Sequence, residues 1–366
     1  MPIYMDRHDV SEAVTAENVA KLHQQDLKIQ HKFNCRGLTY WFDERRKTAF
    51  CLIEAPDKQT IKAMHNEAHG EVPHRIIEVD PNIVESFLGR IEDPKKSGNT
   101  ELNIINDPAF RTIMIIRLEI FPSNKNNATQ FNSRLQNFNK SIIKRLNHFK
   151  GSIVKQNDDY FLVSFKSVTN AVLCALTIKS KIKEPADKLD IRLKIGLSAG
   201  LPVSKQGNFF EDTIKLAERM CNNAKAEIVI SSEVKNLYKS ENHNSFIDTK
   251  SMFVLSPSDE KFLNLLMDCT ERIGKNADLK IDEFTKQLGF SKSQLYRKMI
   301  LVIGKSPNTF LKEYRLNEAL KLLNKQTGNI SEIAFETGFS NLSYFSKCFQ
   351  KRYGCLPSEF VRTKYN

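Results

Sequence analysis

The histidines of this 366-residue chain gather near its beginning, where six of the eight lie within the first 74 residues. Two of them, His65 and His69, are four residues apart in DKQTIKAMHNEAHG, a stretch with the pattern of a helix. This spacing places both imidazoles on one helical face, where they could share a divalent metal ion. The chemistry that the pair suggests is therefore metal coordination.

Two further donors, Cys51 and Glu54, lie in the preceding strand-like stretch TAFCLIEA. They are three residues apart and so face opposite sides of a strand, which argues against one site made of all four residues. Two other interpretations stay open: histidines that are simply exposed to solvent, and a small apolar effector pocket. Such a pocket would be lined by Tyr4, Trp41 and Phe50.

A second group of candidate residues comes from a sequence that occurs twice near the end of the chain. IDEFTKQLGFSKSQLYRKMILVIGKSPNTF spans 281–310, and ISEIAFETGFSNLSYFSKCFQKRYGCLPSEF spans 330–360. Each copy predicts a short helix, a turn that contains Gly289 or Gly338, and a second helix, which together form a helix-turn-helix. The stretch FLKEYRLNEALKLLNK predicts a helix that joins the two copies, because Ser-Pro precedes it and suits a helix start.

The charge of the chain favours an anionic partner. The formal net charge is +12, and residues 255–366 contain 18 Lys and Arg against 12 Asp and Glu, so about half of the excess lies in this segment. Nucleic acid and acidic membrane surfaces are the usual partners of basic proteins. The C-terminal segment is the expected anion-binding part.

The cysteines and the apolar runs indicate the compartment. The seven cysteines are odd in number, scattered and never spaced C-x-x-C, which argues against a disulfide framework or a zinc ribbon. No stretch has the roughly 18 apolar residues needed to span a bilayer, and MPIYMDRHDV lacks the basic and apolar regions of a signal peptide. We expect a soluble, cytoplasmic protein without a membrane partner.

Two polar stretches, residues 92–108 and 239–250, divide the chain into three expected domains. Residues 1–92 show the order βαββαβ of a ferredoxin-like domain. Residues 109–240 alternate strand and helix patterns and predict an α/β sheet domain, and residues 256–366 predict an all-α domain with two helix-turn-helix units. The expected fold class is a multidomain chain, α+β and then all-α.

The C-terminal segment, from about residue 258, resembles the DNA-binding domain of AraC/XylS-type transcriptional regulators. The resemblance is carried by IAFETGFSNLSYFSKCFQKRYGCLPSEF and by KEYRLNEALKLL, which matches the linker helix of the family. It implies that the second helix of each unit enters the major groove of double-stranded DNA. The two helices would lie on one DNA face, about one helical turn (~34 Å) apart.

The resemblance also implies which side chains face the DNA. Arg297 is the strongest candidate for base recognition because a guanidinium group can bridge O6 and N7 of guanine; its alternative role is a phosphate contact. Tyr344 and Phe345 are expected in the interior. The expected base-reading residues are Ser293, Gln294, Tyr296, Arg297, Leu342, Ser343, Ser346 and Lys347. The expected phosphate contacts, alternatively a solvated face, are Lys292, Lys298, Lys351 and Arg352.

Residues 111–238 resemble the class III nucleotide cyclase domain through GSIVKQNDDYFLVSF, IRLKIGLSAG and FFEDTIKLAERM followed by EIVISSEV. The family uses two metal-binding aspartates, and Glu119 and Asp159 stand at their positions. It also uses an Asn and an Arg on one helix; Lys215 replaces the Asn, and Arg219 is retained. A lysine cannot reproduce the paired donor and acceptor of an amide.

The cyclase resemblance therefore implies a degenerate site without catalytic residues, in a domain that pairs two subunits and could still bind a nucleotide. The alternative is that Glu119 and Asp159 are ordinary residues at a strand end and a turn.

Residues 1–80 resemble a family of small ferredoxin-like domains, one of which is known as a nickel-binding protein. The resemblance is carried by FCLIEAPDKQTIKAMHNEAHG and IIEVD. This resemblance makes a divalent metal a candidate cofactor of the N-terminal domain.

Taken together, the sequence predicts a DNA-binding transcriptional regulator and not an enzyme, with an N-terminal sensor for a metal or a small molecule. A dimerising, cyclase-like middle domain would connect the sensor to the bipartite helix-turn-helix. Two alternatives stay open: an active class III nucleotide cyclase that is regulated by DNA binding, and a metal-binding protein with a DNA-binding tail.

Overall fold

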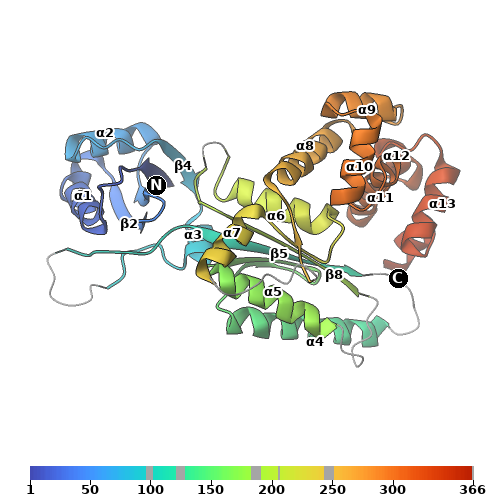
Figure 1. The fold of residues 1–366 in the computed structure, drawn as a ribbon, viewed down its shortest axis with the longest axis horizontal. Helices are drawn as coiled ribbons and strands as arrows, with labels where there is room; N and C mark the ends of the chain where they lie inside the picture. Colours follow the sequence, from blue (N-terminus) through green and yellow to red (C-terminus); the bar gives the residue numbers. More distant parts are fainter. Residues whose placement is uncertain (96–101, 121–127, 183–190, 205–206, 243–250, 365–366) are drawn as a thin grey trace.

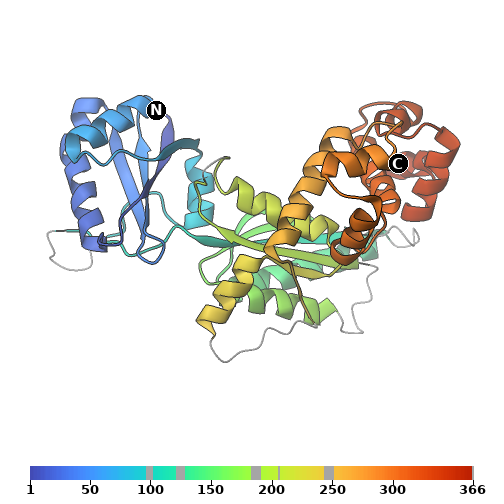
Figure 2. The same ribbon diagram turned by 45° about the horizontal axis from the view of Figure 1, so that its top comes forward.

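Three parts follow one another along the chain (Figure 1). The computed structural model describes residues 1–95, 102–120, 128–182, 191–204, 207–242 and 251–364. A four-stranded sheet with helices lies at the N-terminal end, a six-stranded sheet with helices follows, and a helical part lies at the opposite end (Figures 1 and 2). This mixed α/β chain with a helical C-terminal part confirms the coarse expectation for the fold. Residues 96–101 and 243–250 of the two expected linkers lie outside the described residues.

The N-terminal sheet has the order β2-β3-β1-β4 and is antiparallel throughout. Its helices begin at capping residues, because Thr15 accepts a hydrogen bond from the N–H of Asn18 and Asp57 accepts one from that of Thr60. The order of the main elements is the expected βαββαβ. They are β1 (Ile3–Asp9), α1 (Ala16–Ile29), a 3-10 turn η1 (Gln30–Phe33), β2 (Arg36–Asp43), β3 (Thr48–Glu54), α2 (Lys58–Ala68) and β4 (Arg75–Val79).

A helix that the sequence analysis did not anticipate, α3 (Pro81–Leu88), connects the two sheets. Asp80 caps it, Pro81 occupies its first position, and Gly89 ends it with a φ of 84°. Its residues Val84, Phe87 and Leu88 belong to one core together with side chains from both sheets. The N-terminal part therefore shares its hydrophobic core with the middle part.

Arg111 fixes α3 to the first strand of the middle sheet. Its side chain is buried and donates hydrogen bonds to the carbonyl oxygens of Phe87 (3.0 Å), Leu88 (3.1 Å) and Pro108 (2.6 Å). Burial lowers the pKa of Arg111 to about 10. A cation at the C-terminal end of a helix satisfies its last carbonyls and interacts favourably with its dipole.

The shared core removes the expected effector pocket. Trp41 and Phe50 are paired across β2 and β3, are fully buried, and pack in the core that also contains α3. Tyr4 belongs to a different core, on the face of the sheet that α1 and α2 cover. Successive strand residues point to opposite faces, so these three side chains do not line one cavity. That prediction was wrong.

The middle sheet has the order β10-β9-β8-β5-β7-β6. Its central strand β5 pairs antiparallel with β7 and β8, whereas β9 pairs parallel with β8 and β10. The elements are β5 (Arg111–Ile120), α4 (Ala128–His148), β6 (Ser152–Gln156), β7 (Tyr160–Phe165), α5 (Val168–Ile182), β8 (Ile191–Gly200), α6 (Glu211–Asn223), β9 (Ile228–Ile230), α7 (Ser232–Glu241) and β10 (Phe253–Val254).

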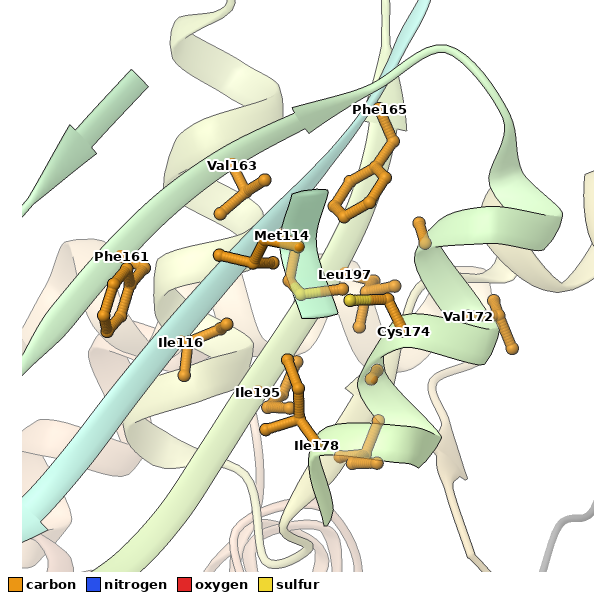
Figure 3. Packing of buried hydrophobic residues seen from close by; sticks show 14 of the residues in the cluster. Met114, Ile116, Phe161, Val163, Phe165, Val172, Cys174, Ile178, Ile195 and Leu197 are labelled. Atoms are coloured by element: carbon orange, nitrogen blue, oxygen red, sulfur yellow. The ribbon is translucent and has the colours of Figure 1, made fainter. Parts of the chain in front are cut away.

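The two faces of this sheet are covered by different helices. Figure 3 shows strand residues such as Met114, Val163 and Leu197 pointing toward Cys174 and Ile178 of α5. Helix α4 belongs to the same core, through Leu135, Ile142 and Leu146. Helix α6 packs on β8 and β5 from the other face. This second face is the one that meets both neighbouring parts of the chain.

The C-terminal part contains the two expected helix-turn-helix units. Gly289 and Gly338 adopt φ angles of 71° and 92° in the turns, a backbone conformation that favours glycine. The joining helix α11 begins as expected, with Ser306 as its cap and Pro307 at its first position. The elements are α8 (Pro257–Ile273), α9 (Ile281–Leu288), α10 (Lys292–Val302), α11 (Pro307–Lys325), α12 (Ile330–Glu336), α13 (Leu342–Tyr353) and α14 (Pro357–Lys364).

The first of these units also shares its core with the middle sheet. Met220 of α6 and Ala224, the residue that ends this helix, pack in one cluster with Leu266 of α8 and Met299 of α10. A backbone hydrogen bond of 3.1 Å from the N–H of Lys225 to the carbonyl of Val302 adds to this contact. The second unit has a separate core, formed mainly by α11, α12 and α13.

Candidate metal centre and nucleic-acid interface

Three side chains of α1 and α2 bring their donor atoms together on the face of the N-terminal sheet that these helices cover. His65 lies in α2, His69 is the residue that ends α2, and Asp26 comes from the last turn of α1. Asp26 Oδ1 lies 3.1 Å from His65 Nδ1 and 3.2 Å from His69 Nε2, and the two nitrogens are 3.3 Å apart. The three side chains are buried, with 1 to 6% of each exposed.

The separation of these atoms fits the ligands of one small metal ion. With bonds of about 2.1 Å, neighbouring ligands lie about 3.0 Å apart in an octahedral site and about 3.4 Å apart in a tetrahedral one. Asp26 Oδ1 is also buried, and no hydrogen bond from outside the cluster reaches it. Two imidazoles and one carboxylate form a donor set that suits a divalent transition metal.

Asp6 of β1 contacts His65 on the side of its ring opposite to Asp26. Its Oδ2 lies 3.0 Å from His65 Nε2, the ring nitrogen that faces away from Asp26. Its Oδ1 accepts the backbone N–H of Cys51 at 3.0 Å and lies 3.4 Å from His8 Nε2. A carboxylate on the second nitrogen of a metal-binding histidine fixes the ring orientation and raises the basicity of the ligand.

The buried charges shift the pKa values of the cluster. Burial alone would lower the pKa of His65, but hydrogen bonds and charges from Asp26 and Asp6 outweigh it and raise that pKa to about 10. Burial opposes ionisation of Asp26 too, yet the two histidines hold its pKa below the usual value. Burial raises the pKa of Cys51 well above that of a free thiol. His65 is therefore an imidazolium bridging two carboxylates in the metal-free protein.

His69 is held in a particular tautomer. Its Nδ1 accepts the N–H of Glu71 at 3.1 Å, so the proton of its neutral ring lies on Nε2 and points toward Asp26. Ligation of a metal by Nε2 would move this proton to Nδ1 and would require the Glu71 N–H to turn away. Glu71 follows Gly70, which is exposed and has a φ of 80°.

The sequence identified half of this cluster. His65 and His69 lie together as expected, but the carboxylates that complete the arrangement come from α1 and β1. Cys51 points toward Asp6 and His8, whereas Glu54 lies 3.3 Å from the N-terminal ammonium, so these two donors do not join one site. A signal for Asp26 exists in the sequence, because it follows Val19, Ala20 and His23 on the buried stripe of α1.

The two recognition helices α10 and α13 present most of the expected base-reading residues to solvent. Seven of the eight are exposed, and Ser346 is half-buried. Gln294 is also engaged within its own helix, because its Oε1 accepts the N–H of the capping residue Ser291 at 3.0 Å. Arg297 and Lys347 are both exposed and stand at matching positions of the two helices. Base recognition itself stays a prediction.

The expected phosphate contacts differ in their surroundings. Lys298 is paired with Asp259 of α8 at 2.6 Å, Lys292 with Asp282 at 2.5 Å, and Arg352 with Glu313 at 3.4 Å. Lys351 is exposed on α13. Their role toward DNA stays a prediction, and the ion pair turns Lys298 toward α8. The interior position expected for Phe345 is confirmed, but Tyr344 is 55% exposed, so that expectation was wrong.

The cyclase-like positions fall in two places. Glu119 and Asp159 stand at neighbouring strand ends, where the Leu118 N–H donates to the carbonyl of Asp159 at 2.8 Å. Lys215 and Arg219 lie on α6 and face α8, which buries Arg219 and leaves Lys215 half-exposed. Arg219 donates to Asn264 Oδ1 (2.9 Å) and Asp268 Oδ1 (2.5 Å), and Lys215 pairs with Asp268 at 3.1 Å. Acidic side chains of α8 therefore pair with both cations.

Comparisons with known families agree with the two ends of the chain. Residues 284–363 match the family described as a helix-turn-helix domain, and residues 4–79 match the family "Nickel responsive protein SCO4226-like". The chain thus combines a C-terminal helix-turn-helix domain of AraC type with an N-terminal SCO4226-like domain. The matched ranges leave the middle sheet outside, and its likeness to cyclases stays a prediction.

Several curated proteins are similar over part of their length. "Histidine kinase P4" of Formosa agariphila is 35% identical over 112 residues, 31% of this chain and 8% of the kinase. An uncharacterized HTH-type transcriptional regulator of Pseudoalteromonas carrageenovora is 36% identical over 86 residues, 24% of this chain and 51% of the relative. HTH-type transcriptional regulator ExsA of Pseudomonas aeruginosa is 28% identical over 117 residues, 29% and 42% of the two chains. The chain spans about half or less of these relatives.

Solved structures are similar to each end. SCO4226 from Streptomyces coelicolor is 28% identical, with coverage of 21% of this chain and 94% of that chain and a TM-score of 0.20. A probable AraC family transcriptional regulator from Rhodopseudomonas palustris is 28% identical, with coverage of 27% and 96% and a TM-score of 0.24. Across the described ranges, no helix is both long enough and apolar enough to cross a membrane.

The first prediction concerns the pH dependence of the metal-free protein. The pKa of His65 is about 10 in the folded state and about 6.5 in the unfolded state, so the stability it contributes is complete below pH 6.5 and is lost as the pH rises toward 10. We expect the free energy of unfolding to fall from pH 7 to 10 in the wild type, and less steeply in His65→Gln. Urea denaturation with a chelator present measures both profiles; parallel profiles would contradict the assignment.

The second prediction compares the two cations that face α8. Arg219→Met should lower the free energy of unfolding by about 1 to 3 kcal/mol, because a side chain only 6% exposed loses several charged hydrogen bonds. Lys215→Met, at a half-exposed position, should change it by no more than about 0.5 kcal/mol. Urea unfolding of the full-length variants provides the comparison. Equal effects would show that burial of Arg219 against α8 contributes little.

Proposed function

We propose that the protein is a metal-responsive transcriptional regulator that binds double-stranded DNA through its two helix-turn-helix units. The observation that carries the proposal is the pair of recognition helices, α10 and α13, joined by the single helix α11 and presenting Arg297 and Lys347 at equivalent exposed positions. The net charge of the segment and its regulator relatives support DNA as the partner. Such a regulator would act in the cytoplasm.

The N-terminal domain, proposed to be ferredoxin-like, is the sensor, and Asp26, His65 and His69 are its metal ligands. The name of the matched family suggests Ni²⁺, which imidazole nitrogens bind well. A bound divalent cation would supply the positive charge that the protonated His65 supplies in its absence. Asp6 would hold the remaining ring N–H of His65, and His8 would contact Asp6 from its other side.

The middle domain is proposed to be a cyclase-like scaffold that pairs two subunits and carries no activity of its own. The engagement of Lys215 and Arg219 by Asp268 supports the absence of catalysis and disfavours an active cyclase or a nucleotide ligand. Because α8 covers this side of α6, pairing would use another surface of the sheet domain. A storage protein with a DNA-binding tail is disfavoured because the sensor and the middle sheet share one core.

The third prediction tests the metal ligands. Purified wild-type protein should bind Ni²⁺, whereas Asp26→Asn and His69→Ala should lose binding because each removes a ligand. Asp6→Asn should weaken the affinity by about 10- to 100-fold, as expected for a residue that orients a ligand. Isothermal titration and metal analysis are the measurements, and His31→Ala, an exposed histidine on η1, is the matched control. Retention of Ni²⁺ by both ligand variants would place the metal elsewhere.

The fourth prediction tests DNA recognition. Selection from a random DNA pool should return a preferred site, on which Arg297→Ala costs about 1 to 3 kcal/mol and relaxes selectivity at one base pair. Lys351→Ala should weaken all sequences about equally and lower the magnitude of the log K against log salt slope by about one. Competition binding on the selected site and its single-base changes separates the two effects. If no sequence is preferred, the proposed function is wrong.

A further inference from the structure

Tyr344 is exposed at the start of the second recognition helix. The side of α13 that faces the protein is occupied by Phe345 and Phe349, which are fully buried in the core of the second unit. Tyr344 contacts only the edge of that core, where its ring centroid lies 6.2 Å from that of Phe339, and it keeps 55% of its surface exposed. Packing therefore accounts for one edge of the ring and leaves more than half of this large aromatic side chain facing solvent.

The two recognition helices place Tyr344 and Gln294 at the same position. Ser291 caps α10 and accepts the N–H of Gln294 at 3.3 Å, and Asn341 caps α13 and accepts the N–H of Tyr344 at 2.8 Å. In α10 the Gln294 side chain folds back to the N–H of Ser291. A phenol ring cannot complete this capping box. The Tyr344 side chain instead lies along the outside of α13, where its hydroxyl group is within hydrogen-bond reach of Cys348, one turn later.

The neighbours of Tyr344 belong to the proposed DNA interface. Ser343 precedes it, and Lys347, three residues later, lies about 60° away around a helix with 100° per residue. Both are exposed, and both are proposed to read bases. An aromatic ring in this patch would enter the major groove with them.

We infer that Tyr344 reads DNA, and that its ring recognises the 5-methyl group of a thymine in the half-site bound by α13. This inference rests on the proposed function. Thymine is the base that presents an apolar group in the major groove, and apolar side chains select it by contact with that methyl group. The half-site of α10, with Gln294 and Arg297 at the matching positions, would be recognised by hydrogen bonds instead. The two halves of the DNA site would therefore be recognised by different chemistry, one by a methyl contact and the other by hydrogen bonds.

The test combines a change in the protein with a change in the DNA. Thymines of the selected site are replaced by deoxyuridine in one half at a time, which removes only the methyl group. Full-length wild-type protein should bind the site with deoxyuridine in the α13 half roughly fourfold more weakly, the effect of one buried methyl group. Tyr344→Phe should show the same loss, because the ring is retained. Tyr344→Ala should bind the thymine and deoxyuridine sites equally.

Four outcomes would overturn the inference. Equal losses for wild type and Tyr344→Ala on deoxyuridine would show that another side chain contacts the methyl group. A loss of affinity in Tyr344→Phe as large as that in Tyr344→Ala would assign recognition to the hydroxyl group. If no site is selected, the proposed function and this inference are both wrong. If a site is selected but deoxyuridine in the α13 half does not weaken binding of the wild type, only the inference is wrong. Circular dichroism checks folding of each variant, and if Tyr344→Ala is unfolded, Tyr344→Gln, which carries the residue found at the matching position of α10, replaces it as the variant without the ring.

Discussion

The close packing of helix α6 on strand β8 is the contact on which the arrangement of all three parts depends. A Cβ atom at Gly196 of β8 would come within 2.2 Å of the carbonyl oxygen of Ala217, and one at Gly200 would meet Thr213 Oγ1 at 2.2 Å. Only glycine allows this approach. Seated in this way, α6 places Ala217 and Cys221 in the core shared with the N-terminal domain, and Met220 and Ala224 in the core shared with the first helix-turn-helix unit. One helix thus packs with both the proposed sensor and the proposed DNA-binding domain.

The proposed metal-binding cluster is connected to this helix through strand β1. Asp6, which holds His65, faces the helices of the N-terminal domain, and the preceding residue, Met5, faces the other way into the core that contains Ala217 of α6. Burying two carboxylates is costly unless cations or hydrogen bonds compensate them. The metal-free cluster achieves this with a protonated His65, and exchange of that proton for the proposed divalent ion would change the charge beside Asp6, in the middle of β1. The packing supplies a physical route by which such a change would reach α6.

Local patterns in the sequence predicted most elements, and tertiary contacts account for what they missed. The caps at Thr15, Asp57 and Ser306 lie where helices begin, and the duplicated phrase located both helix-turn-helix units. Asp6 and Asp26 could not be assigned to the histidines because they are 59 and 39 residues distant from His65 and meet it only after the sheet forms. The predicted burial of Tyr344 was wrong because an aromatic residue on a helix is usually buried. The predicted effector pocket was wrong because strand alternation directs Trp41 into the core shared with the middle sheet. The acidic partners of Arg219, Asp268 and Glu271, come from α8, so no motif within the middle domain could predict them.

The two helix-turn-helix units are attached to the rest of the molecule in unequal ways. The first unit shares its core with α6 and β9, and its recognition helix is tied at Lys298 to α8 and at Val302 to the loop after α6. The second unit has a core of its own, to which α11 contributes Leu316, Ala319 and Leu323. Because α11 also inserts Phe310 into the core of the first unit, it carries the second recognition helix as an extension of the first. A displacement of α6 would therefore act directly on α10 and would reach α13 only through α11. In the proposed complex with DNA, the orientation of α11 would then set whether both recognition helices can bind at once.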